Sequence, residues 1–132
     1  MGTVVVDSSV VISFFVAKDT HHHAVEQAIA DVRQSGGEFS LPMSVLSESM
    51  VGGYRNGTAD ELHQAITSIF GRARPMDEAI ALRAAELRAR TRSLRLPDAL
   101  VVATALVDNA DVLTCDKRLA DVDERVRVVQ PG

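Results

Sequence analysis

The chain has 132 residues, 46% of them hydrophobic, so its length predicts one domain over residues 1–132 with an apolar core that needs no disulfide. Its single cysteine, Cys115, excludes an intrachain disulfide, and no apolar run reaches the ~20 residues of a membrane span, so we expect a soluble, cytoplasmic protein without a signal peptide. The formal net charge of −4 argues against a general nucleic-acid binder.

Strand and helix patterns alternate along the chain. β-branched and apolar runs predict short strands at 3–6, 38–41, 72–75, 111–116 and 126–130. Segments with helical periodicity predict helices at 9–17, 21–34, 44–54, 60–72, 77–93 and 97–108, with a short helical turn at 117–122. This alternation is typical of a parallel sheet covered by helices on both faces, so we predict a three-layer α/β fold with four to five central strands.

Two segments have an unusual composition. Residues 97–108 carry apolar or small side chains on nearly every face, so this helix should be almost completely buried. Between Arg72 and Arg95 lie seven of the chain's 14 basic residues, beside only three acids. Two interpretations of this arginine-rich segment stay open, namely a solvated helix face and a surface that binds phosphate or a partner.

Two carboxylates stand where buried strands should end. Asp7 follows VVV, with Ser8 or Ser9 expected to cap the next helix, and Asp116 follows VLTC. Because parallel sheets bind ligands outside the carboxyl ends of their strands, both acids should lie at that edge. Taken alone, Asp7 could be a turn residue and Asp116 a helix cap.

Two further acids lie in helices with apolar surroundings. Glu48 belongs to the segment LPMSVLSESMVGGY, and Asp98 lies in the first turn of the buried helix, where the helix dipole favours an anion. Taken alone, Asp98 could simply compensate the helix dipole, and Glu48 could be a solvated helix residue. Clustered carboxylates repel one another unless a cation offsets their charge, and an all-oxygen site suits Mg²⁺ or Mn²⁺ better than zinc. Together the acids predict metal-dependent hydrolysis of a phosphodiester.

Four short motifs occur in order along nearly the whole chain: VVVDSSV, LSE, LPDAL with ATAL, and LTCDKRLA. In these motifs the sequence resembles the PIN-domain ribonucleases and, more narrowly, the VapC toxins of bacterial toxin-antitoxin pairs. The resemblance implies a PIN-like fold and places the catalytic and metal-binding acids of the family on Asp7, Glu48, Asp98 and Asp116. It also implies that the hydroxyls of Ser9 and Thr114 orient these carboxylates.

The same resemblance implies a Mg²⁺-dependent endoribonuclease, with Mn²⁺ able to substitute, that cleaves RNA by metal-activated water; tRNA, rRNA and mRNA are all open as substrates. It implies a VapB-type antitoxin whose tail crosses the acidic groove and inserts an arginine. It further implies a homodimer, for which the early helices offer apolar positions at Val45, Leu46, Ile66 and Ile69.

Other assignments compete with the toxin. A PIN-domain nuclease of RNA processing would share these motifs. A receiver-like Mg²⁺-binding signalling domain needs an adjacent acidic pair after the first strand, and a haloacid-dehalogenase-like phosphatase needs D-x-D, whereas this chain has VVVDSS. The small size of the chain, without an appended domain, favours the toxin.

Several other side chains have a structural interpretation. The histidines at 21–23 resemble a metal tract, but three adjacent residues at a helix start should point in different directions, so we expect a structural role. Cys115 should face the core. We do not expect a catalytic thiol, because such a thiol needs a positioned histidine that the sequence does not specify. Met43, Met50 and Met76 are expected to be packing residues.

Overall fold

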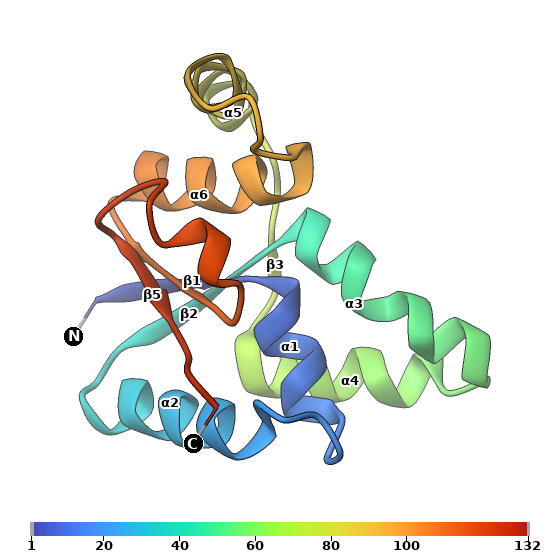
Figure 1. The fold of residues 1–132 in the computed structure, drawn as a ribbon. Coiled ribbons are helices and arrows are strands. Elements are labelled where there is room, and N and C mark those ends of the chain that lie inside the picture. Colours follow the sequence, from blue (N-terminus) through green and yellow to red (C-terminus); the bar gives the residue numbers. More distant parts are fainter. Residues whose placement is uncertain (1, 132) are drawn as a thin grey trace.

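The computed structural model describes residues 2–131 and contains a five-stranded, all-parallel sheet with helices on both faces (Figure 1). Residues 1 and 132 of the predicted domain lie outside the described residues. The spatial order of the strands is β3-β2-β1-β4-β5. Their bounds are β1 (Thr3–Val6), β2 (Glu38–Pro42), β3 (Ala73–Arg74), β4 (Asp111–Thr114) and β5 (Val126–Val128). The predicted three-layer α/β fold is confirmed.

Each predicted helix is present, with ends that differ by a few residues. The helices are α1 (Ser8–Phe15), α2 (His22–Gln34), α3 (Met43–Asn56), α4 (Ala59–Phe70), α5 (Glu78–Arg90) and α6 (Leu96–Asp108), with a 3-10 turn η1 (Lys117–Leu119). Helices α1, α2 and α4 lie on one side of the sheet, and α5 and α6 lie on the other (Figure 1). No helix within residues 2–131 is both long and apolar enough to cross a bilayer.

The central strand β1 ends next to β4, at the edge of the sheet where a site can form. Its three valines are at most 4% exposed, as expected for a strand covered on both faces. Val6 is in register with Leu113 of β4, and the backbone N–H of Asp7 donates to the carbonyl of Leu113 at 3.0 Å. The carboxyl ends of β1 and β4 therefore lie side by side, although more than a hundred residues separate them in the chain.

Helix α6 packs against this pair of strands and against α5. Its alanine and valine side chains from residue 99 to residue 105 are buried, as the composition of the segment predicts. The two ends of the helix are less buried, because Leu96 is 49% exposed and Val107 is 38% exposed. Because α6 begins near the carboxyl edge of the sheet, its first turn lies next to the strand ends.

The cap of α1 differs from the predicted one. Asp7, rather than Ser8 or Ser9, is the N-cap residue, and its Oδ1 accepts a hydrogen bond from the backbone N–H of Ser8 at 2.9 Å. The helix starts immediately after β1, so the first acid of the chain is also the residue at which strand becomes helix. Its backbone is consequently held by elements on both sides.

The predicted dimer surface is wrong in its residues. Val45 and Ile66 are 0% exposed and belong to the monomer's own core, and Leu46 and Ile69 pack against that core. The amphipathic stripes of α3 and α4 thus cover the sheet instead of a second copy. Met50 packs as predicted, but Met43 and Met76 are about half exposed, so they are not packing residues.

Candidate active site

An open cleft of about 360 Å³ lies at the carboxyl edge of the sheet. It is bounded by the turn after β1, the start of α1, the middle of α3, the start of α6 and the turn after β4. The four acids singled out in the sequence all line it: Asp7, Glu48, Asp98 and Asp116. The fold therefore brings together carboxylates from four separate segments, as the rule for parallel sheets predicts.

Asp7 is the most firmly held of these acids. Its side chain is buried at 5% exposure, and its Oδ2 accepts hydrogen bonds from the hydroxyls of Ser9 at 2.8 Å and Thr114 at 2.7 Å. Both hydroxyls in turn accept backbone N–H groups, from Cys115 and Asp116 respectively, at 3.0 Å. This network joins the ends of β1 and β4 and fixes the carboxylate in one orientation.

Asp98 and Glu48 share an unfavourable negative environment. Burial raises the pKa of Asp98, the charge of Asp7 raises it further, and the nearby Arg95 opposes both. Although Glu48 remains partly exposed, partial burial of its carboxyl group raises its pKa, and the charges of Asp7 and Asp98 add to this effect. A cation among these groups would remove the repulsion and favour their charged forms.

Asp116 has a different environment, because an arginine already neutralises it. The guanidinium of Arg118 contacts both of its carboxylate oxygens, and the hydrogen bonds from Arg118 lower the pKa of Asp116. Asp116 also caps η1, so the helix-cap interpretation holds for this residue in addition to its place in the cleft. In the same cleft, Arg95 Nε lies 3.4 Å from Asp98 Oδ2.

The spacing of the acids bears on which metal they could hold. Within residues 2–131, only His22, His23 and Glu26 place three ligand atoms of His, Cys, Asp or Glu within 4.8 Å of one another. The cleft acids therefore form no closed cage. Mg²⁺ is typically bound by one or two carboxylates and keeps several waters, so separate carboxylates around an open cleft fit Mg²⁺ or the similar Mn²⁺.

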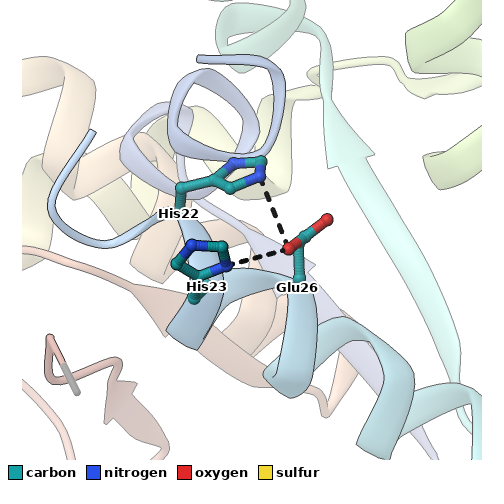
Figure 2. Close-up of side chains that lie close together, drawn as sticks. All are labelled: His22, His23 and Glu26. Carbon is teal, nitrogen blue, oxygen red and sulfur yellow. Dashed lines mark ion pairs between the residues drawn. The ribbon is translucent and has the colours of Figure 1, made fainter. Parts of the chain in front are cut away.

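The histidine tract is more organised than predicted. His21 lines the cleft beside Asp19, whereas His22 and His23 both approach Glu26 one turn later in α2 (Figure 2). The expectation that all three rings would diverge is therefore wrong for the last two. The expected structural role fits His22, whose Nδ1 lies 2.8 Å from the carbonyl oxygen of Ser13 in α1.

Sequence reasoning did not identify Arg95, which lines the cleft, or Arg118, which pairs with the cleft acid Asp116. Arg95 precedes Asp98 by three residues, which is a spacing at which side chains on a helix can pair. Arg118 follows Asp116 by only two residues, a spacing that does not by itself indicate a pair. The rest of the arginine-rich segment includes intramolecular contacts: Arg74 pairs with Asp108 at 2.8 Å, and Arg83 pairs with Glu86 at 3.0 Å. Arg95, in contrast, faces the cleft.

Cys115 is half-buried and lines the cleft as well as packing against the core. Burial raises the pKa of its thiol, so the neutral form is favoured at neutral pH. A nucleophilic cysteine needs the opposite shift. The thiol therefore packs partly against the core, as the sequence predicts, but its place in the cleft lining was not predicted.

Comparison with known proteins agrees with this architecture. The structure resembles a toxin-antitoxin complex from Klebsiella pneumoniae (TM-score 0.80, 22% identity, covering 98% of this chain and 99% of that one) and FitAcB from Neisseria gonorrhoeae (TM-score 0.78, 21% identity, 97% of each chain). It also resembles VapBC2 from Rickettsia felis bound to a promoter DNA fragment (TM-score 0.76, 11% identity, 96% of each chain). No curated protein matches the chain. A family model described as PIN domain matches residues 4–125, so the chain belongs to the PIN domain family.

Proposed function

We propose that this protein is a Mg²⁺-dependent endoribonuclease, with Mn²⁺ able to substitute, and that it acts in the cytoplasm as the toxin of a VapBC-type pair. The observation that carries the proposal is the meeting of Asp7, Glu48, Asp98 and Asp116 at one open cleft. Two of the similar structures support the toxin role, because one is named a toxin-antitoxin complex and another is named VapBC2. A PIN-domain nuclease of RNA processing is the alternative.

The acids have different proposed roles, which follow from their surroundings. The proposed metal ligands are Asp7 and Asp98. Two hydroxyls fix the carboxylate of Asp7. Burial disfavours the charged form of Asp98, and a bound cation would stabilise that form. A bound Mg²⁺ would polarise the RNA phosphate and activate water there. Glu48 is suited to accept a proton, because burial and the charges of Asp7 and Asp98 raise its pKa and it remains accessible to water.

Two arginines are suited to bind the RNA backbone. Arg95 and Arg118 have side chains that are 65% and 71% exposed, and each already reaches the cleft through an ion pair. When the cleft acids are neutralised otherwise, both guanidinium groups are free to turn toward a phosphate, whose oxygens match their paired donors. Such contacts would let a chain with net charge −4 hold RNA locally.

An antitoxin would fit a groove next to the cleft. The groove, of about 420 Å³, lies between α1, α3 and the start of α4 and is lined by apolar side chains that include Val16 and Val51. Ile12 and Glu48 line both groove and cleft, so one peptide could occupy the two together. We propose an antitoxin tail with apolar residues in the groove and an arginine among the acids.

A homodimer remains part of the proposal, with a different surface from the predicted one. Leu82 of α5 and Val107 of α6 are exposed and line a shared hollow. Because α6 begins at the cleft and Val107 lies at its far end, a second copy seated there would leave the cleft open to RNA.

The experiment that tests the function is expression in the native host. The wild-type protein alone should arrest growth, co-expression of the adjacent gene should rescue it, and D98N should be harmless without rescue. If folded wild-type protein causes no growth defect without that neighbour but still cleaves RNA, the RNA-processing alternative replaces the toxin.

A further inference from the structure

A second cluster of metal-binding side chains lies at the start of α2, outside the acidic cleft (Figure 2). Glu26 Oε1 is 3.4 Å from His22 Nε2 and 3.4 Å from His23 Nδ1. The spacing explains this convergence, because residues three and four apart lie on the same face of an α-helix. The ligand atoms of all three side chains lie within 4.8 Å of one another.

The hydrogen bond of His22 determines which of its nitrogens is free. A carbonyl oxygen can only accept, so Nδ1, at 2.8 Å from the carbonyl of Ser13, must carry the hydrogen. In the neutral imidazole Nε2 then presents a lone pair, and it presents that lone pair to the carboxylate of Glu26. Two lone pairs face each other with repulsion unless a proton or a metal ion lies between them.

The surroundings of His22 match those of a metal ligand. Metal-bound histidines usually donate their second N–H to a carboxylate or a backbone carbonyl, which fixes the ring and its tautomer. The bond to Ser13 does this, and only 13% of the His22 side chain is exposed. His23 is 94% exposed and Glu26 is 49% exposed, so an ion can enter from solvent.

We propose that His22 Nε2, His23 Nδ1 and Glu26 Oε1 bind a divalent transition metal ion of the zinc class, with water in the remaining position. Two imidazoles and one carboxylate favour Zn²⁺, Ni²⁺ or Cu²⁺ over Mg²⁺. None of the three ligands lines the proposed nuclease cleft, although Ser13, which holds His22, does.

The bound ion stabilises the junction of α1 and α2. Through His22 it connects the start of α2 to the Ser13 carbonyl near the end of α1. The unfolded chain does not hold the three ligands together, so binding favours the folded state. This inference does not depend on the proposed ribonuclease activity.

The test is a Zn²⁺ titration of the tag-free full chain by calorimetry, in excess Mg²⁺ so that hard-oxygen sites are already filled. Wild type should bind one Zn²⁺ per chain and melt at a higher temperature as Zn²⁺ is added. H23A and E26Q should each weaken Zn²⁺ binding at least about tenfold, since even partners behind a ligand cost that much. Both residues are exposed, so neither change should unfold the protein.

H63A is the matched control, because His63 is an exposed histidine on another helix, α4. It should bind Zn²⁺ as wild type does. The proposal is overturned if wild type binds no Zn²⁺ under these conditions, if H23A and E26Q bind it as tightly as wild type, or if H63A weakens binding as much as they do.

Discussion

Arg118 holds Asp116 with both arms of its guanidinium: Nε donates to Oδ1 at 3.0 Å and Nη2 donates to Oδ2 at 2.7 Å. The backbone N–H of Arg118 adds a hydrogen bond to Oδ1 at 2.9 Å. Because its charge is balanced within the chain, Asp116 stays ionised at the cleft, and its lowered pKa contrasts with the raised pKa of Asp98. The counter-ion of Asp116 is therefore Arg118 of the same chain.

Replacing this counter-ion should impair RNA binding more than chemistry. R118A removes a guanidinium proposed to contact phosphate, so KM for RNA should rise about 3- to 10-fold, as for the loss of a partly solvated charged hydrogen bond worth ~1 kcal/mol. The fall in kcat should be smaller. R92A, which removes an exposed arginine outside the cleft, is the control. Equal KM values for R118A and wild type would argue against the phosphate contact.

Metal removal should abolish cleavage. Because the cleft acids offer only oxygen ligands, EDTA should stop RNA cleavage, and excess Mg²⁺ or Mn²⁺ should restore it. Cleavage is followed by gel electrophoresis of labelled RNA, with D98N purified in parallel to reveal contaminating nucleases. Full activity of wild type in EDTA, absent from D98N, would rule out a metal-dependent mechanism.

The D98N variant should show whether Asp98 is needed for catalysis or for folding. The substitution keeps the size of the side chain and removes a charge that is unfavourably buried near Asp7, so cleavage should be lost while the metal-free protein becomes slightly more stable. Thermal denaturation in EDTA measures the second effect. D121N, at an exposed position, is the control and should change neither property. A D98N protein that unfolds would mean that Asp98 has a structural role instead.

The raised pKa values predict the pH dependence of stability. Between the unfolded and folded pKa of Asp98 and Glu48, the folded state binds more protons than the unfolded state, so the free energy of unfolding decreases as pH rises through this interval. The destabilisation is complete above the folded pKa. Other groups, such as Asp116 with its lowered pKa, contribute with the opposite sign, so the contribution of Asp98 is isolated as a difference.

The difference in unfolding free energy between D98N and metal-free wild type should therefore increase with pH over the mildly acidic range. Denaturant titrations at several pH values measure it. Saturating Mg²⁺ should abolish or reverse the trend, because a bound cation stabilises the charged carboxylates of the wild type. A difference that stays constant with pH would show that Asp98 does not titrate as its burial implies.

Thr114 offers a test of carboxylate orientation. T114V removes the hydroxyl that donates to Asp7 and accepts from the backbone of Asp116, so stability should fall by ~1–3 kcal/mol and activity by about 10- to 100-fold. T104V is matched to it, because Thr104 is also a buried threonine but hydrogen-bonds only to the carbonyl of Leu100 within α6 among the described contacts. T104V should retain activity. Similar losses of activity in both variants would indicate a general packing effect.

Much of the fold could be predicted because it depends on local patterns. The β-branched run of β1 and the apolar residues on nearly every face of α6 specify buried elements regardless of what packs on them. The alternation of strands and helices along the chain predicts a parallel sheet. That sheet has one edge at which strand ends meet, so Asp7 and Asp116 could be placed at one site from the sequence alone. Ser9 and Thr114 were inferred from a family resemblance, and the structure places both against Asp7.

Other features depended on contacts between distant segments. Val45 and Ile66 have the same apolar character whether they face the core or a partner, and only the position of the sheet shows that they are buried. Two further features are local in the chain, namely the pairing of Arg118 with Asp116 and the approach of His22 and His23 to Glu26. Spacing permits these contacts, but whether they form depends on side-chain rotamers.

The sequence by itself thus determined the order of the elements and the edge at which the acids gather, because hydrophobic periodicity and strand direction are properties of the chain. The tertiary structure decided which charges are already paired, which apolar residues remain exposed and which nitrogen of His22 is free. These depend on distances of a few ångströms between side chains from different turns or elements, and composition and spacing do not specify such distances.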